Sequence, residues 1–149
     1  MNNDQTQPPD SNPANFTNDA YAKRIEKPWG YELHWVEEKA PYMGKVLHIT
    51  GGARLSLQTH DAKQESWLVI QGRAAVIWED ASGKLIETEL EPGKGYSTAI
   101  GQKHRLVGIT DCDIVEVSTP EIGTTWRLDD DYARPNETPE QRRKERGET

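Results

Sequence analysis

Four side chains in the middle of the chain have the types and the spacing that bind divalent metal ions. Gln58 and His60 are two residues apart, so in a strand both would point to the same face. Glu65 follows after a short turn, and His104 lies on a distant segment. These two nitrogens and two oxygens suit Zn²⁺, Mn²⁺, Co²⁺, Ni²⁺ or Fe²⁺, with Zn²⁺ or Mn²⁺ favoured, and leave coordination positions open. We therefore predict one divalent ion here, with the open positions that metal catalysis needs.

Each histidine has a structural alternative. A lone histidine inside a β-barrel commonly forms hydrogen bonds and binds no metal, and we assign His34 and His48 to that class. Gln58 is the weakest of the four donors, because a neutral amide oxygen is a poorer ligand than an imidazole. Without it a three-residue site would remain.

The segments that must position these donors are typical of an all-β domain. Short stretches rich in Val, Ile, Leu, Trp and Thr alternate with turn signals, and none between residues 44 and 120 keeps a helical period for three turns. We predict strands over 31–36, 43–49, 54–58, 66–70, 73–79, 84–89, 96–98, 104–109 and 113–118. Strands this short and numerous form a sandwich or a barrel.

Two glycine-bounded motifs contain the donors. The first spans residues 52–72 and the second residues 93–108. Their spacing resembles the paired motifs of the cupin superfamily, with Gln58 in place of the usual first histidine, Ala99 in place of a proline and Gly108 in place of an asparagine. The resemblance implies a single-domain cupin, which is a double-stranded β-helix or jelly-roll barrel.

The flanking sequence is similar to the type II mannose-6-phosphate isomerase cupin domain over about residues 26–134. The residues that carry this similarity are Lys27-Pro28-Trp29-Gly30-Tyr31-Glu32, Tyr42, Lys45, Arg54-Leu55-Ser56-Leu57-Gln58, Glu65, Trp67, Lys103-His104-Arg105-Leu106, Glu116 and Arg127-Leu128-Asp129-Asp130-Asp131-Tyr132-Ala133-Arg134. The resemblance implies the Gln-His-Glu-His ligand set and a sugar-phosphate aldose-ketose isomerase. Such an enzyme moves a proton between C1 and C2, and its metal stabilises the enediolate. Residues 61–64 and Ser66 depart from the histidine-rich run of that family.

An isomerase of this type needs a group that moves the proton. The candidates are Lys45 or a water next to Glu65, followed by Asp130 and Tyr132 as catalytic residues. Each would have to lie within about 3 Å of the migrating proton.

A phosphorylated substrate also needs a cation, and the arginine guanidinium matches phosphate oxygens. We predict Arg54, Arg127 and Arg134 as substrate-binding residues. Arg54 shares strand parity with Gln58, so it should face the same cavity if that strand is unbroken. Trp67 should wall the metal pocket. The alternatives are surface ion pairs for the arginines and a core position for the tryptophan.

Composition excludes several classes of protein. The 149 residues carry 18 Lys+Arg and 25 Asp+Glu, a net charge of -7, which disfavours nucleic acid as a partner. With Cys112 alone there is no internal disulfide and no cysteine-based zinc site. No apolar run approaches the roughly 20 residues of a membrane span. We expect a cytoplasmic protein with a small-molecule substrate, no membrane association and, by resemblance to other cupins, a homodimer.

The two ends differ from the middle in composition. Residues 1–20 are polar and predict a disordered leader, residues 21–134 the barrel, and residues 135–149 a polar charged tail. Thr138 as a cap and Pro139 at the first helical position indicate one or two helical turns in an otherwise solvated tail.

Two other functions fit the same scaffold. One is a cupin that binds a small polar ligand without turning it over, and the other is an iron-dependent oxygenase or lyase. Gln58 argues against the second, because redox cupins usually rely on more histidine ligands.

Overall fold

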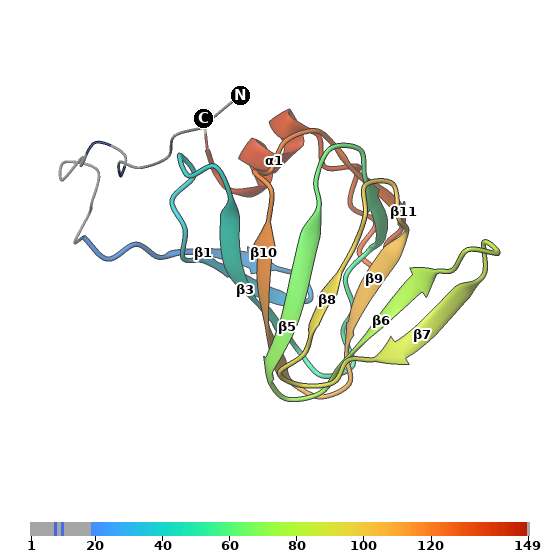
Figure 1. The fold of residues 1–149 in the computed structure, drawn as a ribbon. Helices are drawn as coiled ribbons and strands as arrows, with labels where there is room; N and C mark the ends of the chain where they lie inside the picture. Colours follow the sequence, from blue (N-terminus) through green and yellow to red (C-terminus); the bar gives the residue numbers. More distant parts are fainter. Residues whose placement is uncertain (1–7, 9, 11–18, 149) are drawn as a thin grey trace, which may run out of the picture.

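Two antiparallel sheets enclose one core in the computed structural model, which describes Pro8, Asp10 and residues 19–148 (Figure 1). The first sheet has the strand order β1 (Lys23–Lys27), β2 (Gly30–His34), β3 (Met43–Ile49), β10 (Cys112–Ser118), β5 (Glu65–Gln71) and β8 (Gly95–Ser97). The second has the order β11 (Thr125–Asp129), β4 (Leu57–His60), β9 (His104–Gly108), β6 (Ala74–Glu79) and β7 (Leu85–Glu89). The expected all-β barrel is confirmed.

The nine strands expected from the sequence overlap β2 to β10, and two further strands escaped the pattern. β1 reads KRIEK, and its single apolar residue, Ile25, is also its only buried residue. β11 reads TWRLD, and both of its apolar residues, Trp126 and Leu128, are exposed. Both strands are held by pairing with a neighbour, β2 and β4 respectively, rather than by an apolar inward face.

The inward faces change from charged to apolar along the strands of the first sheet. On β3 the inward Lys45 is followed by the buried Leu47, and on β10 the buried Ile114 precedes the inward Glu116. Because these strands pair in register, like residues collect at the same end of the barrel. The apolar end forms the core: Trp29, Leu47, Ile49, Trp67, Val69, Ala74, Val76, Leu90, Leu106, Cys112 and Ile114. The opposite end is polar and holds the candidate site.

A one-residue irregularity separates Arg54 from β4. Arg54 is bridged to Val107, whereas Gln58 is paired with His104, so four steps along one strand match three along the other. One extra residue in such a pair acts as a bulge and reverses which face the side chains point to. The strand expected over 54–58 is therefore broken, and β4 begins at Leu57.

The C-terminal segment, residues 135–148, packs against the barrel. Its helix α1 (Pro139–Glu145) begins at the Thr138 cap, whose hydroxyl accepts a hydrogen bond from the Gln141 amide, as the sequence predicts. The expectation of a solvated tail is wrong for this segment, because Arg142 is 7% exposed and donates hydrogen bonds to the carbonyls of Glu121 and Gly123. The leader predicted for residues 1–20 falls almost wholly outside the described residues. Within the described part of the chain, no helix is long and apolar enough to cross a membrane.

Candidate metal centre

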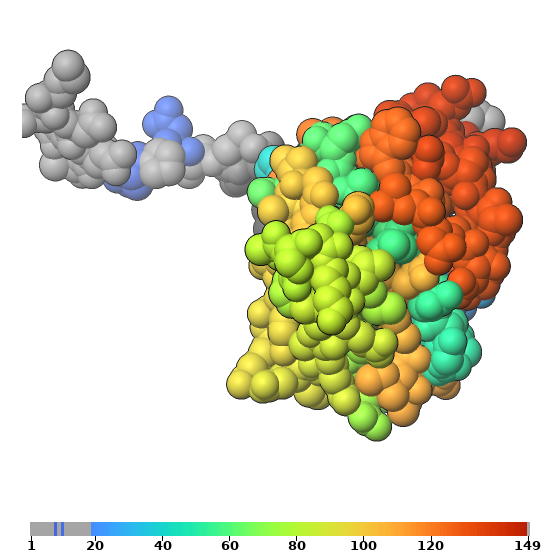
Figure 2. All heavy atoms as spheres, turned by 90° about the vertical axis from the view of Figure 1, so that its right-hand side faces the viewer, coloured from blue at the N-terminus to red at the C-terminus, as the bar shows by residue number. Residues whose placement is uncertain are grey.

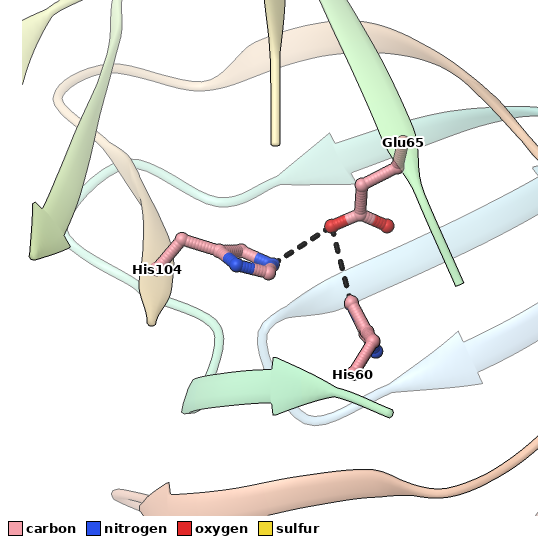
Figure 3. Close-up of side chains that lie close together, drawn as sticks. All are labelled: His60, Glu65 and His104. Carbon is pink, nitrogen blue, oxygen red and sulfur yellow. Dashed lines mark hydrogen bonds and ion pairs between the residues drawn. The ribbon is translucent and has the colours of Figure 1, made fainter. Parts of the chain in front are cut away.

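Three of the four expected donors converge at the polar end of the barrel (Figure 3). His60 ends β4, Glu65 begins β5 and His104 begins β9, and all three side chains are buried. Glu65 Oε1 lies 2.8 Å from Nε2 of His104 and 3.3 Å from Nε2 of His60. The candidate ligand atoms all lie within 4.8 Å of one another, so one ion could contact each of them.

Hydrogen bonds on the far side of the rings orient both histidines. Nδ1 of His104 lies 2.9 Å from the Gln102 carbonyl oxygen, which can only accept, so Nδ1 donates this hydrogen bond and Nε2 is the ring nitrogen left to face a metal ion. That Nε2 is buried and makes no hydrogen bond of acceptable geometry. Nδ1 of His60 lies 3.1 Å from the hydroxyl of Thr125. Metal-binding histidines are typically held in this way by a second partner, so these residues fit a divalent ion.

Gln58 lies on the same face as the three converging donors. It is the strand partner of His104 and lines the interior cavity beside His60 and Glu65. Its Oε1 accepts a hydrogen bond of 2.8 Å from the hydroxyl of the buried Ser56. The amide oxygen is thereby oriented, and it can supply the fourth donor.

Lys63 is the neighbour of the centre that the sequence analysis missed. Its ammonium is 2.9 Å from Glu65 Oε2 and 3.0 Å from Glu116 Oε1. Burial alone would raise the pKa of Glu65, but the Lys63 charge and the close imidazole rings of His104 and His60 outweigh it and hold that pKa well below its ordinary value. Glu65 is therefore an anion, the form in which a carboxylate binds a metal.

Lys45 lines the cavity but has the wrong protonation state for a general base. Its ammonium is 3.3 Å from Glu32 Oε2 and 3.7 Å from Glu116 Oε1, and it also forms an ion pair with Glu121. Burial lowers the pKa of Lys45, yet Glu121 and Glu32 outweigh burial and raise it above the ordinary value. Lys45 is a cation at neutral pH and can donate a proton or a hydrogen bond, so the expected role as base is wrong for this arrangement.

Asp130 and Tyr132 are not among the residues that line the cavity. The Asp130 carboxylate forms two side-chain hydrogen bonds with the Arg134 guanidinium, at 2.9 and 2.8 Å. Tyr132 packs against the hydrophobic core, and the Arg134 guanidinium lies over its ring at 5.4 Å. Both residues support Arg134, and the structure does not bring either to the metal donors.

The predicted substrate-binding residues divide into two groups. Arg127 and Arg134 line the cavity, whereas Arg54 forms a two-pronged ion pair with Asp131 and is 39% exposed. The parity argument for Arg54 is wrong because of the irregularity before β4. Trp67 lies behind the centre, with its ring 5.2 Å from that of His104, and is part of the core rather than a wall of the cavity.

Comparison with known proteins agrees with this geometry. The family model described as "Mannose-6-phosphate isomerase C-terminal" matches residues 15–134, which is most of the chain. The chain belongs to this family. The alginate biosynthesis protein AlgA of Pseudomonas aeruginosa is 30% identical to this member of the family over 115 residues. The alignment covers 74% of this chain and 23% of AlgA, so the chain spans about a quarter of the length of that relative.

Solved structures show the cupin fold of this mannose-6-phosphate isomerase C-terminal family member. KdgF from Halomonas sp. has a TM-score of 0.57 at 18% identity, covering 66% of this chain and 88% of its own. A variant of the Bacillus subtilis oxalate decarboxylase OxdC has a TM-score of 0.61 at 16% identity, covering 72% and 30%. The capsular polysaccharide assembling protein CapF from Staphylococcus aureus has a TM-score of 0.57 at 15% identity, covering 80% of this chain and 33% of its own. At these identities the likeness concerns the fold alone.

Proposed function

We propose that the protein is a metal-dependent aldose-ketose isomerase that acts on a phosphorylated sugar, of the mannose-6-phosphate isomerase type. The observation that carries the proposal is the convergence of His60, Glu65 and His104, two of which, His60 and Glu65, line a cavity that also presents Arg127. Together with Gln58, these three donors would hold one divalent ion, with Zn²⁺ or Mn²⁺ favoured. Bound there, the ion would supply a Lewis acid that stabilises negative charge on the sugar oxygens.

The proton has to be moved by a residue of the cavity other than Lys45. Glu116 lines the cavity and lies between the ammonium groups of Lys63 and Lys45. Burial raises the pKa of Glu116, and the charge of Glu65 raises it further, in spite of the two lysines. A carboxyl group with a raised pKa exchanges protons closer to neutral pH, which suits a general acid-base residue. In this proposal Glu116 accepts the proton and Lys45 donates hydrogen bonds to the substrate oxygens.

Deuterium uptake into the sugar tests this function directly. The full chain, loaded with Zn²⁺ or Mn²⁺, is incubated in heavy water with mannose 6-phosphate, fructose 6-phosphate and several pentose phosphates. We expect uptake at C1 or C2 by NMR, lost in His60→Ala and retained in His48→Ala, whose histidine pairs with Asp113 outside the cluster. No uptake with any sugar or metal would overturn the proposal.

The second candidate is a cupin that binds a small ligand without turnover, and the size of the cavity favours a ligand smaller than a sugar phosphate. The interior space measures about 50 Å³, enough for an ion and very few water molecules. A sugar phosphate can enter only if ion-paired side chains move aside. Ligand binding without deuterium uptake would support this candidate. The homodimer also stays a proposal, which sedimentation of the full chain would test.

A further inference from the structure

The C-terminal segment contributes carboxylates to the polar end of the barrel. The backbones of Glu137 and Thr125 exchange two hydrogen bonds, of 3.0 and 2.9 Å, so the segment continues the sheet beyond β11. In Figure 1 α1 lies at the end of the barrel reached by β10 and β5, and in Figure 2 the red C-terminal residues form a continuous part of the surface. This segment lies beyond the residues that the family model matches.

Glu145 of this segment binds two buried cations. One of its oxygens is 2.9 Å from Nη1 of Arg127, and the other is 3.2 Å from Nη2 of Arg127 and 3.4 Å from Nζ of Lys27. The side chains of Arg127 and Lys27 are 4% and 6% exposed. This parallel, two-pronged geometry is the one by which a guanidinium binds either a carboxylate or a phosphate.

The two cations also stand between the surface and the metal donors. Lys27 lines both the interior cavity and a surface groove of about 240 Å³, whose wall includes Arg134 and Glu145. Arg127 is the strand partner of Gln58, so its side chain leaves the sheet on the cavity face beside a metal donor. An anion held by Arg127 and Lys27 would therefore lie next to the space in which a metal-bound sugar would sit.

The buried positions of Lys27 and Arg127 require that an anion always lies beside them. A buried guanidinium or ammonium is costly unless it is paired. Glu137 stays beside Arg127 at 2.9 Å and is fixed to β11 by its backbone. Glu145 is the last residue of α1 and belongs to no strand pair, so its side chain can be withdrawn without breaking one. An incoming dianion would replace its charge.

We propose that Lys27 and Arg127 form the binding site for the phosphate group of the substrate, and that the Glu145 carboxylate occupies this site until phosphate displaces it. The inference deepens the proposed function, since it rests on a phosphorylated substrate and gives that phosphate a place. It also accounts for the small interior cavity, because displacing Glu145 loosens the segment that covers the polar end.

Binding of inorganic phosphate to the full chain tests the proposal without any turnover. Glu145→Gln keeps the size of the side chain and removes its charge, so we expect phosphate to bind about tenfold more tightly by calorimetry. Glu140→Gln is the matched control, because Glu140 is exposed on the same helix and no contact involves it among the described residues. Lys27→Gln should weaken binding several-fold. Arg127→Lys keeps the positive charge but loses the two-pronged guanidinium geometry, so it should also weaken phosphate binding several-fold. It replaces Lys27→Gln as the test if that variant does not fold.

Hydrogen exchange supplies a second readout. Phosphate should speed amide exchange across α1 in the wild-type chain and leave β10 unchanged. The proposal would be overturned if wild type and Glu145→Gln bound phosphate with equal affinity, or if neither Lys27→Gln nor Arg127→Lys changed that affinity. Either result would indicate that phosphate binds another group, such as the metal. If phosphate competes with Glu145 but the protein shows no deuterium uptake into any sugar, the isomerase proposal is contradicted and the proposal of a phosphate site at Lys27 and Arg127 is supported.

Discussion

Gln58 lies directly opposite His104 where β4 pairs with β9. Opposed residues in an antiparallel pair have side chains on the same face, with Cβ atoms about 5 Å apart. The poorest donor of the set is therefore fixed beside a histidine whose ring is itself held by the Gln102 carbonyl. Backbone register, rather than a flexible loop, sets this half of the centre.

Substitutions in the donor set should weaken metal binding in a graded way. We expect His104→Ala to lower the affinity for Zn²⁺ by more than about 100-fold, and Gln58→Ala by about tenfold, because an amide contributes less than an imidazole. Competition with a chromogenic chelator measures both. His48→Ala is the control and should bind Zn²⁺ as the wild type does. A Gln58→Ala protein with unchanged affinity would show a three-residue site.

Removal of the Lys63 ammonium should destabilise the fold strongly. Lys63→Met removes the cation that links the buried carboxyl groups of Glu65 and Glu116, so we expect a loss of about 3–5 kcal/mol in the free energy of unfolding. Urea denaturation measures it. Lys94→Met is the matched control, since the exposed Lys94–Glu91 pair should contribute no more than about 1 kcal/mol. Similar losses for the two variants would mean that the buried pairing contributes little.

The sequence predicted which side chains converge at the candidate metal centre, partly from strand alternation and partly from the resemblance to the cupin motifs. Alternation along a strand places Gln58 and His60 on one face, and the resemblance to the paired cupin motifs implies that Glu65 and His104 join them. The strand positions followed equally well wherever apolar residues alternate, as in β3, whose bounds are those expected. The strand positions and the shared face of Gln58 and His60 need only the neighbouring sequence.

The sequence could not predict what depends on pairing between distant segments. Lys63 reads as a surface residue, and only the fold shows that Glu65, Glu116 and Glu121 surround it. The prediction for Arg54 was wrong because a single bulge reverses the alternation of side-chain faces along the strand. No residue type in 54–58 predicts that bulge. The charged C-terminal segment has the composition of a solvated tail, and it is bound because its charges match buried partners on the barrel.

The ion pairs of Glu145 should make stability depend on pH in a defined window. Burial raises its pKa, but the hydrogen bonds and charge of Arg127 and the charge of Lys27 lower it from 4.5 to about 2. Since the folded-state pKa is the lower one, Glu145 stabilises the fold above pH 4.5, and this contribution is lost as the pH falls towards 2. Glu145→Gln should therefore be less stable than wild type at pH 7 and equal to it near pH 2. Urea titrations at several pH values measure the difference. A constant difference from pH 7 to pH 2 would contradict the ion pairing.

Arg54 and Arg127 provide a paired test of which arginine meets the substrate. Arg54 is bound to Asp131 at the surface, so Arg54→Gln should change stability by at most about 1 kcal/mol and leave the KM for a sugar phosphate within about twofold. Arg127→Gln removes a cation that faces the cavity, so KM should rise more than about tenfold with a smaller change in kcat, as expected when binding energy common to substrate and transition state is lost. A larger KM effect from Arg54→Gln than from Arg127→Gln would place the phosphate on the other side of the barrel wall.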